Sequence, residues 1–166
     1  TNYYLEVQEY SANSDTYALT VSQIVSEGTP TSPVLLTVGT SHAGSVNASG
    51  NSYYKFQTNS TGEYSIAITN SQSNGTASLG IQISSTDFTS PTLVKTCTAG
   101  YNPTCSVNGL AANTYYYVEV SQSYPYDVIY NIAVNPGSSE GSVSNPVQLT
   151  YGANHVGAVD AYGYSY

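Results

Sequence analysis

Hydrophobic and polar residues alternate in short runs along most of this chain. Tyr54 and Phe56 stand two residues apart, with Lys55 between them. Tyr64, Ile66 and Ile68 show the same period of two. Such a period is typical of strands with one buried side. No window places hydrophobic residues at helical spacing over three turns. The pattern therefore predicts an all-β fold.

Eight or nine short strands are expected, at spacings of 8 to 14 residues. Strands of this length and spacing are typical of an antiparallel β-sandwich, here of jelly-roll type. Residues 85 to 92 are expected to form a loop, and Val107 and Leu110 to cover one end of the core. The predicted strands of this sandwich are 34–38, 43–48, 53–58, 64–68, 79–83, 93–94, 116–120 and 130–134; two further strands, 2–8 and 17–21, are expected before it.

The chain repeats itself at a fixed offset of 113 residues, as from His42 to His155. Over the whole overlap, 22 of 53 aligned pairs are identical without a gap. The matches include Glu27 with Glu140 and Ser52 with Ser165. A repeat of this length implies a fold-sized unit that recurs along a longer chain.

The repeat divides the chain into one complete unit, 27–139, and two partial ones. Residues 1–26 are expected to be the C-terminal strands of a preceding unit plus linker, and 140–166 the N-terminal strands of a following unit. Residues 22–33 are rich in Ser, Thr, Gly and Pro, which is typical of a linker between domains. We expect a window on a longer tandem array; the alternative is a subunit completed by strands from its neighbours.

Composition excludes several classes of partner. Only 2 residues are Lys or Arg, against 10 Asp or Glu, for a net charge of −8. This charge argues against nucleic acid and anionic membranes, which both attract basic surfaces. No stretch has the apolar length of a membrane span. The 18 tyrosines suit a β-rich surface, because Tyr places its ring on a sheet and its hydroxyl in water.

Two cysteines indicate where the protein works. Cys97 and Cys105 enclose a short segment with the turn formers Gly100, Asn102 and Pro103, so a disulfide closing a loop is expected. A disulfide implies an oxidising, extracellular or cell-surface location. Three Asn-x-Ser/Thr motifs fit such a location as glycosylation sites, although motifs of three residues are weak signals. Their asparagines are Asn47, Asn59 and Asn74.

Several strand motifs occur in an order that resembles the bacterial pre-peptidase C-terminal domain. These are Pro33 to Gly39, Gly44-Ser45-Val46, Ser52 to Phe56, Gly62 to Ile66 and Leu110 to Val120. The resemblance covers the whole repeat. It implies a β-sandwich of the kind appended to secreted proteases and found as tandem repeats in surface proteins.

Calcium is a weak expectation and no other cofactor is expected. The resemblance implies Asp just before the Tyr-Tyr-Lys-Phe strand, where this chain has Ser52 and Ser165. Calcium requires six or more oxygen ligands, and the acidic residues here are scattered. The candidates are Glu27, Glu140 and Asp160, and the alternative is that they are solvated acids of the linker.

No motif for catalysis is present, so the chain is not expected to be an enzyme. His42 and His155 occupy equivalent places in different units, which separates them by a domain. Each is expected to begin a strand and to bond the backbone. Nucleophile elbows, zinc motifs and phosphate-binding loops are absent from the sequence.

Outward-facing tyrosines are the most informative surface feature. They form a candidate contact patch, because Tyr is enriched at interfaces. We expect the patch to join repeats or subunits, and stacking on sugar rings is the alternative. Its members are Tyr4, Tyr115, Tyr117, Tyr124 and Tyr126.

The sequence thus favours a non-catalytic repeat of an extracellular filament, stalk or adhesin. Its expected partners are copies of itself or neighbouring repeats, and glycans. The alternative is a carbohydrate- or protein-binding module appended to a secreted enzyme.

Overall fold

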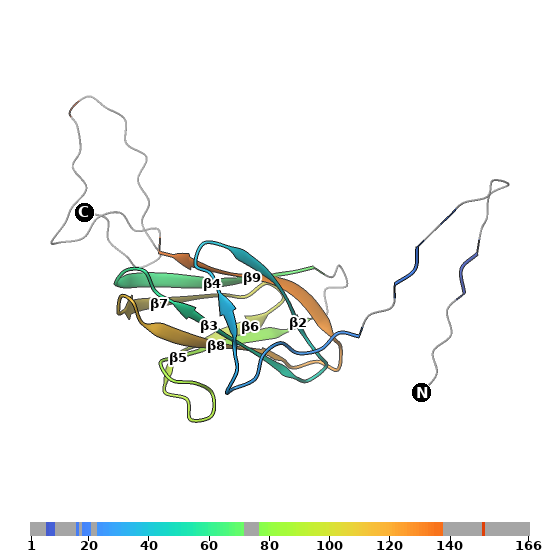
Figure 1. The fold of residues 1–166 in the computed structure, drawn as a ribbon, viewed down its shortest axis with the longest axis horizontal. Coiled ribbons are helices and arrows are strands. Elements are labelled where there is room, and N and C mark those ends of the chain that lie inside the picture. Colours follow the sequence, from blue (N-terminus) through green and yellow to red (C-terminus); the bar gives the residue numbers. More distant parts are fainter. Residues whose placement is uncertain are drawn as a thin grey trace.

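The computed structural model describes residues 6–8, 16, 18–20, 23–71, 77–137 and 151. The strands of this part form two sheets that face one another (Figure 1). The predicted β-sandwich is therefore confirmed. The strands are β1 (Val34–Leu36), β2 (Ser41–Val46), β3 (Asn51–Gln57), β4 (Gly62–Asn70), β5 (Leu79–Ser84), β6 (Leu93–Gly100), β7 (Thr104–Leu110), β8 (Tyr115–Gln122) and β9 (Val128–Pro136).

One sheet has five strands in the order β1-β3-β8-β5-β6, and the other has four in the order β2-β9-β4-β7. All pairings are antiparallel except β1 with β3, which run parallel. The predicted antiparallel sandwich therefore has one parallel pair, at this edge. The reason is the path of the chain: β2 crosses to the other sheet between β1 and β3, so the chain returns to the first sheet in its original direction.

The core lies between the sheets and contains the inward residues that alternation predicts. Tyr54, Phe56 and Tyr64 are fully buried, as are Ile81 and Tyr130. Along β3 the burial alternates residue by residue, since successive side chains of a strand point to opposite faces. The period-two signal therefore identified the two inner faces correctly.

The segment around the cysteines differs from its predicted form. It is two strands, β6 and β7, joined by a turn, and they are the edge strands of opposite sheets. The Cys97–Cys105 disulfide, with a Cα–Cα distance of 5.6 Å, therefore links the two sheets across one open side. Val107 and Leu110 belong to β7 and are buried between the sheets.

The segment before β1 is attached to the sandwich along part of the predicted linker. The hydroxyl of Ser45 donates to the carbonyl of Val25 at 2.7 Å, and the amide of Tyr53 donates to the carbonyl of Glu27 at 2.8 Å. Gly28 has a φ of +64°, and a Cβ there would lie 2.3 Å from the carbonyl oxygen of Tyr53. Of the two predicted partial units at the chain ends, the structure describes residues 6–8, 16, 18–20 and 23–26 in the first and only residue 151 in the second; the rest lies outside the described residues.

Candidate functional site

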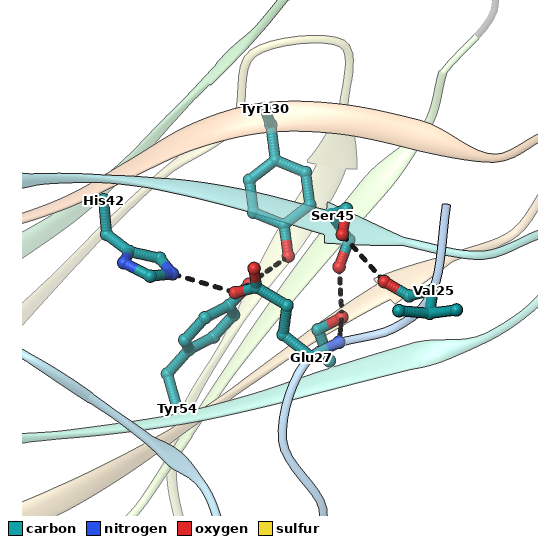
Figure 2. Close-up of polar contacts among 7 residues, drawn as sticks. Val25, Glu27, His42, Ser45, Tyr54 and Tyr130 are labelled. Carbon is teal, nitrogen blue, oxygen red and sulfur yellow. Dashed lines mark hydrogen bonds and ion pairs between the residues drawn. The ribbon is translucent and has the colours of Figure 1, made fainter. Parts of the chain in front are cut away.

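A polar cluster joins the entering chain to both sheets. The Oε2 atom of Glu27 accepts hydrogen bonds from Nε2 of His42 at 2.9 Å and from the Tyr54 hydroxyl at 3.0 Å (Figure 2). The Tyr54 hydroxyl is in turn 2.7 Å from that of Tyr130. β2 and β3 supply the partners of Glu27, and these strands belong to different sheets, so one carboxylate connects the entering segment to both sheets.

The direction of the hydrogen bonds in this cluster follows from which groups have protons. A carboxylate only accepts, so His42 and Tyr54 both donate to Glu27. Since the single proton of Tyr54 is used in this way, Tyr130 donates to the Tyr54 oxygen. Figure 2 shows this chain running from Tyr130 through Tyr54 to Glu27, with His42 approaching from the other side.

Burial keeps both phenols neutral. Desolvation, followed by the interactions with Tyr130 and Glu27, raises the pKa of Tyr54 far above its ordinary value. Desolvation is also the main reason that the pKa of Tyr130 is raised to about 12. The charged form of each group is disfavoured because it would lie in a medium of low polarity beside a carboxylate. At neutral pH the chain of donors is therefore intact.

Two small residues make room for the cluster. A Cβ at Gly44 would lie 2.7 Å from both Cε2 of Tyr130 and the hydroxyl of Tyr54. Ser52 is fully buried; its hydroxyl accepts from the amide of Glu27 at 2.9 Å and donates to the Ser45 carbonyl at 2.6 Å. Ser52 thus fixes the backbone of Glu27. It stands at the position where the family resemblance implies an aspartate.

The expectation that His42 bonds the backbone is wrong, because its side chain pairs with Glu27. The carboxylate of Glu27 is also not a freely solvated linker acid: the side chain is only 25 % exposed. Within the described ranges, no group of three or more His, Cys, Asp or Glu side chains is gathered as a metal site would require. The calcium candidates Glu140 and Asp160, and His155, lie outside the described residues.

The chemistry of the cluster is that of a structural clasp. In the described part of the chain no hydroxyl or thiol nucleophile bonds the imidazole of His42, whose recorded side-chain partner is a carboxylate. Activation of a nucleophile requires that nucleophile and base lie within hydrogen-bond reach. The arrangement therefore holds a chain segment in place.

A second candidate site is the outer face of the five-stranded sheet. Residues that alternate with the buried ones place Tyr53, Lys55, Tyr115, Tyr117 and Glu119 on this face. Tyr53 lies opposite Glu119, and Lys55 opposite Tyr117, on neighbouring strands. The Lys55 ammonium lies 5.5 Å from the centre of the Tyr115 ring. Aromatic rings therefore alternate with charged groups over this face.

The loop after β5 limits this face on one side. The ring of Phe88, in that loop, lies 5.7 Å from the ring of Tyr53. Partial burial is the main cause of a raised pKa at Tyr53. The side chain of Asn51 donates to the Tyr53 hydroxyl at 3.3 Å and to Glu119 at 3.4 Å. These contacts fix the orientation of groups at the edge of the face.

The structure divides the predicted tyrosine patch into two places. Tyr115 and Tyr117 lie on β8, on the outer face of the five-stranded sheet. Tyr124 and Tyr126 lie in the turn between β8 and β9, beyond the opposite end of β8 from Tyr115. Tyr4 is outside the described residues. The four tyrosines that the structure describes therefore do not form one continuous patch.

The glycosylation motifs occupy turns. Asn47 and Asn59 are exposed, after β2 and after β3 respectively. The carbonyl oxygen of the Asn59 side chain accepts a hydrogen bond from the buried Tyr64 hydroxyl at 2.7 Å, which fixes this turn. Asn74 lies outside the described residues.

The clasp of Glu27, His42, Tyr54 and Tyr130 was missed in the sequence, although a signal for it exists. The repeat matches Glu27 with Glu140 and His42 with His155, and Gly44 with Gly157. Residues that recur together at a fixed offset are candidates for mutual contact. Nothing in the spacing of Glu27 and His42 along the chain indicated that a connection across two strands would bring them together.

Neither a family model nor a curated protein sequence matches this chain. Among solved structures, the fold is similar to the pre-peptidase C-terminal domain of a collagenase from Bacillus anthracis, with a TM-score of 0.48 and 18 % identity over 68 % of this chain and 99 % of that one. It is also similar to a β-glucosidase from Paenibacillus barengoltzii, with a TM-score of 0.29 and 12 % identity over 60 % of this chain and 11 % of that one. The likeness is one of fold. In its described part, the chain has no helix long and apolar enough to cross a membrane.

Proposed function

We propose that the sandwich is a non-catalytic module of an extracellular protein and that it binds carbohydrate on the outer face of its five-stranded sheet. The observation that supports this most directly is the set of Tyr53, Tyr115 and Tyr117 beside Lys55 and Glu119. Aromatic rings present a flat apolar surface, while their hydroxyls and the neighbouring charged groups form hydrogen bonds. A sugar ring has the same combination of an apolar face and hydroxyls at its rim.

An extracellular location is part of this proposal. The Cys97–Cys105 bond supports it, because disulfides persist mainly in oxidising compartments. The net charge of −8 is consistent with an uncharged ligand more than with an acidic one.

Binding to insoluble cellulose, chitin and xylan tests the proposal. The 166-residue chain is expected to be depleted from solution by at least one of them. Tyr115→Ala and Tyr117→Ala are expected to weaken that binding about tenfold each, which corresponds to about 1.4 kcal/mol. Tyr126→Ala, at a tyrosine that is exposed but away from this face, is the matched control. Absence of binding to all three polymers, or equal losses in the control, would contradict the proposal.

A second candidate function rests on the repeat. Identity at 22 of 53 positions between successive units suits a structural element of a filament, stalk or adhesin, in which copies of one domain are arranged in series. Electron microscopy of the native secreted material tests this function directly. Ordered filaments would support it, and dispersed monomers would count against it.

A further inference from the structure

The chain enters and leaves the sandwich at opposite ends. Val25 is bonded to Ser45, which lies opposite Ile129 near the start of β9. The chain leaves at Pro136, the last residue of β9. Seven residues separate Ile129 from Pro136, a distance of roughly 23 Å along an extended strand. In Figure 1 the entering segment, in blue, reaches the sandwich on the right and the arrow of β9, in orange, ends on the left.

The repeat leaves almost no free chain between one unit and the next. At the offset of 113, Gln23 corresponds to Pro136, where the sandwich ends. The next sandwich is already bonded at Val25. Two residue steps span about 7 Å at most. The free connection between two units is therefore shorter than the spacing of about 10 Å between packed sheets. A connection this short brings the loops at the facing ends of the two units into contact.

The entry end presents hydrophobic side chains of the kind that a contact would cover. Val25 is 53 % exposed, Tyr124 49 %, Tyr126 53 % and Ile129 41 %. The turn containing the two tyrosines is held firmly. The amide of Ser49 donates to the Tyr124 carbonyl at 3.1 Å, and the side chain of Gln122 donates to the Tyr126 carbonyl at 3.3 Å.

The exit end is equally well ordered. Thr58 is buried, and its hydroxyl donates to the carbonyl of Ala111 at 2.6 Å and accepts from the amide of Thr114 at 3.0 Å. The amide of Gly137 donates to the carbonyl of Glu63, which continues the attachment of the chain just beyond β9. Both surfaces of the junction are therefore formed before they meet.

We propose that consecutive units of this protein pack end to end, with the exit end of one unit covering Val25, Tyr124, Tyr126 and Ile129 of the next. The occupant of this surface is the preceding copy of the same sandwich in the same chain. The result is a stiff row of domains in place of domains on flexible linkers. The inference rests on the tandem repeat and on the path of the chain; it does not depend on carbohydrate binding.

A two-copy protein tests the junction. Residues 25–137 contain all nine strands and number 113, which equals the repeat, so two copies of this segment joined directly reproduce the natural step. The two-copy protein is expected to melt about 5 °C higher than one copy, because about 1 kcal/mol shifts the melting temperature of a domain this size by that order. Small-angle X-ray scattering is expected to show a rigid rod.

Variants separate the junction from the fold itself. Val25→Ser combined with Tyr126→Ser is expected to abolish the gain in melting temperature of the two-copy protein while leaving the single copy unchanged. Insertion of a ten-residue Gly-Ser linker between the copies is expected to have the same effect. The proposal is overturned if one and two copies melt together, or if the double variant lowers both melting temperatures equally. Neither measurement involves a sugar, so its outcome is independent of the polysaccharide test.

Discussion

At the scale of single residues, Glu27 connects the chain entry to the core. It accepts hydrogen bonds from one side chain on each of β2 and β3, and through Tyr54 it is coupled to Tyr130 on β9. Bonds to a charged acceptor are stronger than those between neutral groups, and the loss of one partner leaves a costly half-buried charge. The entry segment is therefore held by side-chain chemistry as well as by backbone bonds.

Replacement of Gly44 by alanine tests the packing of this cluster. The added Cβ would lie 2.7 Å from atoms of Tyr54 and Tyr130, so one ring must shift. We expect a loss of about 1–3 kcal/mol in the free energy of unfolding, the usual cost of overpacking. Denaturant titration measures it. Gly100→Ala is the matched control, since a Cβ there meets nothing within 4 Å; equal effects of both changes would refute the steric explanation.

The pKa of Tyr130, raised to about 12, predicts that stability falls at alkaline pH. Above pH 10 the unfolded chain loses its phenolic protons, while the folded chain retains this one until about pH 12. The unfolded state then binds fewer protons, so the free energy of unfolding decreases as pH rises from 10 to 12, by about 1.4 kcal/mol per pH unit for each such group. Below pH 10 this group makes no pH-dependent contribution.

Tyr130→Phe is expected to make the alkaline loss of stability shallower, because the phenol of residue 130 no longer titrates in the unfolded chain. Urea unfolding followed by circular dichroism at pH 9, 10 and 11 measures the slope. Tyr124→Phe, at an exposed tyrosine, is expected to leave the slope unchanged. An identical slope in wild type and Tyr130→Phe would show that the buried pair is not the cause.

At the scale of elements, the two strands around the disulfide protect one open side of the sandwich. β6 is an edge strand, and its residues are mostly exposed. An exposed edge invites pairing with other chains, and a lysine on the edge discourages it. Lys95 lies on β6, and the disulfide joins β6 to β7 of the other sheet. Lys95 and the disulfide therefore both disfavour pairing of other chains with this edge.

Removal of the disulfide is expected to loosen this side first. The double variant Cys97→Ala with Cys105→Ala should lose about 2–3 kcal/mol of stability, as the entropy of a loop this short predicts. Hydrogen exchange should show reduced protection in β6 and β7 while β3 and β8 keep theirs. Melting with and without reductant checks the same point in the wild-type chain. A uniform loss of protection in all strands would contradict a local role for the bond.

The central strands and the edge strands β1 and β2 could be predicted from the sequence, whereas the edge strand β6 was predicted only over residues 93–94 and β7 was not predicted. Tyr116, Val118 and Val120 alternate with polar residues because both inner faces are buried, so their pattern carries the fold. β6 lacks this pattern, since most of its residues are exposed. In β7 the alternation of Cys105 and Val107 was present but was attributed to a loop. The clasp of Glu27 depends on strand order, which no local pattern encodes.

At the scale of the whole molecule, the described sandwich has its entrance and its exit at opposite ends. This arrangement follows from the path of the last two strands. β8 crosses the larger sheet in one direction, and β9, the last of the nine strands, then crosses the smaller sheet in the opposite direction. The entry segment and β9 both lie beside β2. Units joined as we propose would extend along the direction of the strands.

The path of the chain also sets how the sandwich would respond to tension. A pull applied at Val25 and at Pro136 is directed along β9, parallel to its neighbours β2 and β4. Rupture then requires many backbone bonds to shear together, whereas a pull across the strands would open them one at a time. Single-molecule stretching through these two points should therefore give a higher breaking force than stretching through Val25 and Ser71, which bonds Ile129 at the entry end of β9. Domains that are hard to extend in this way suit a cell surface exposed to flow.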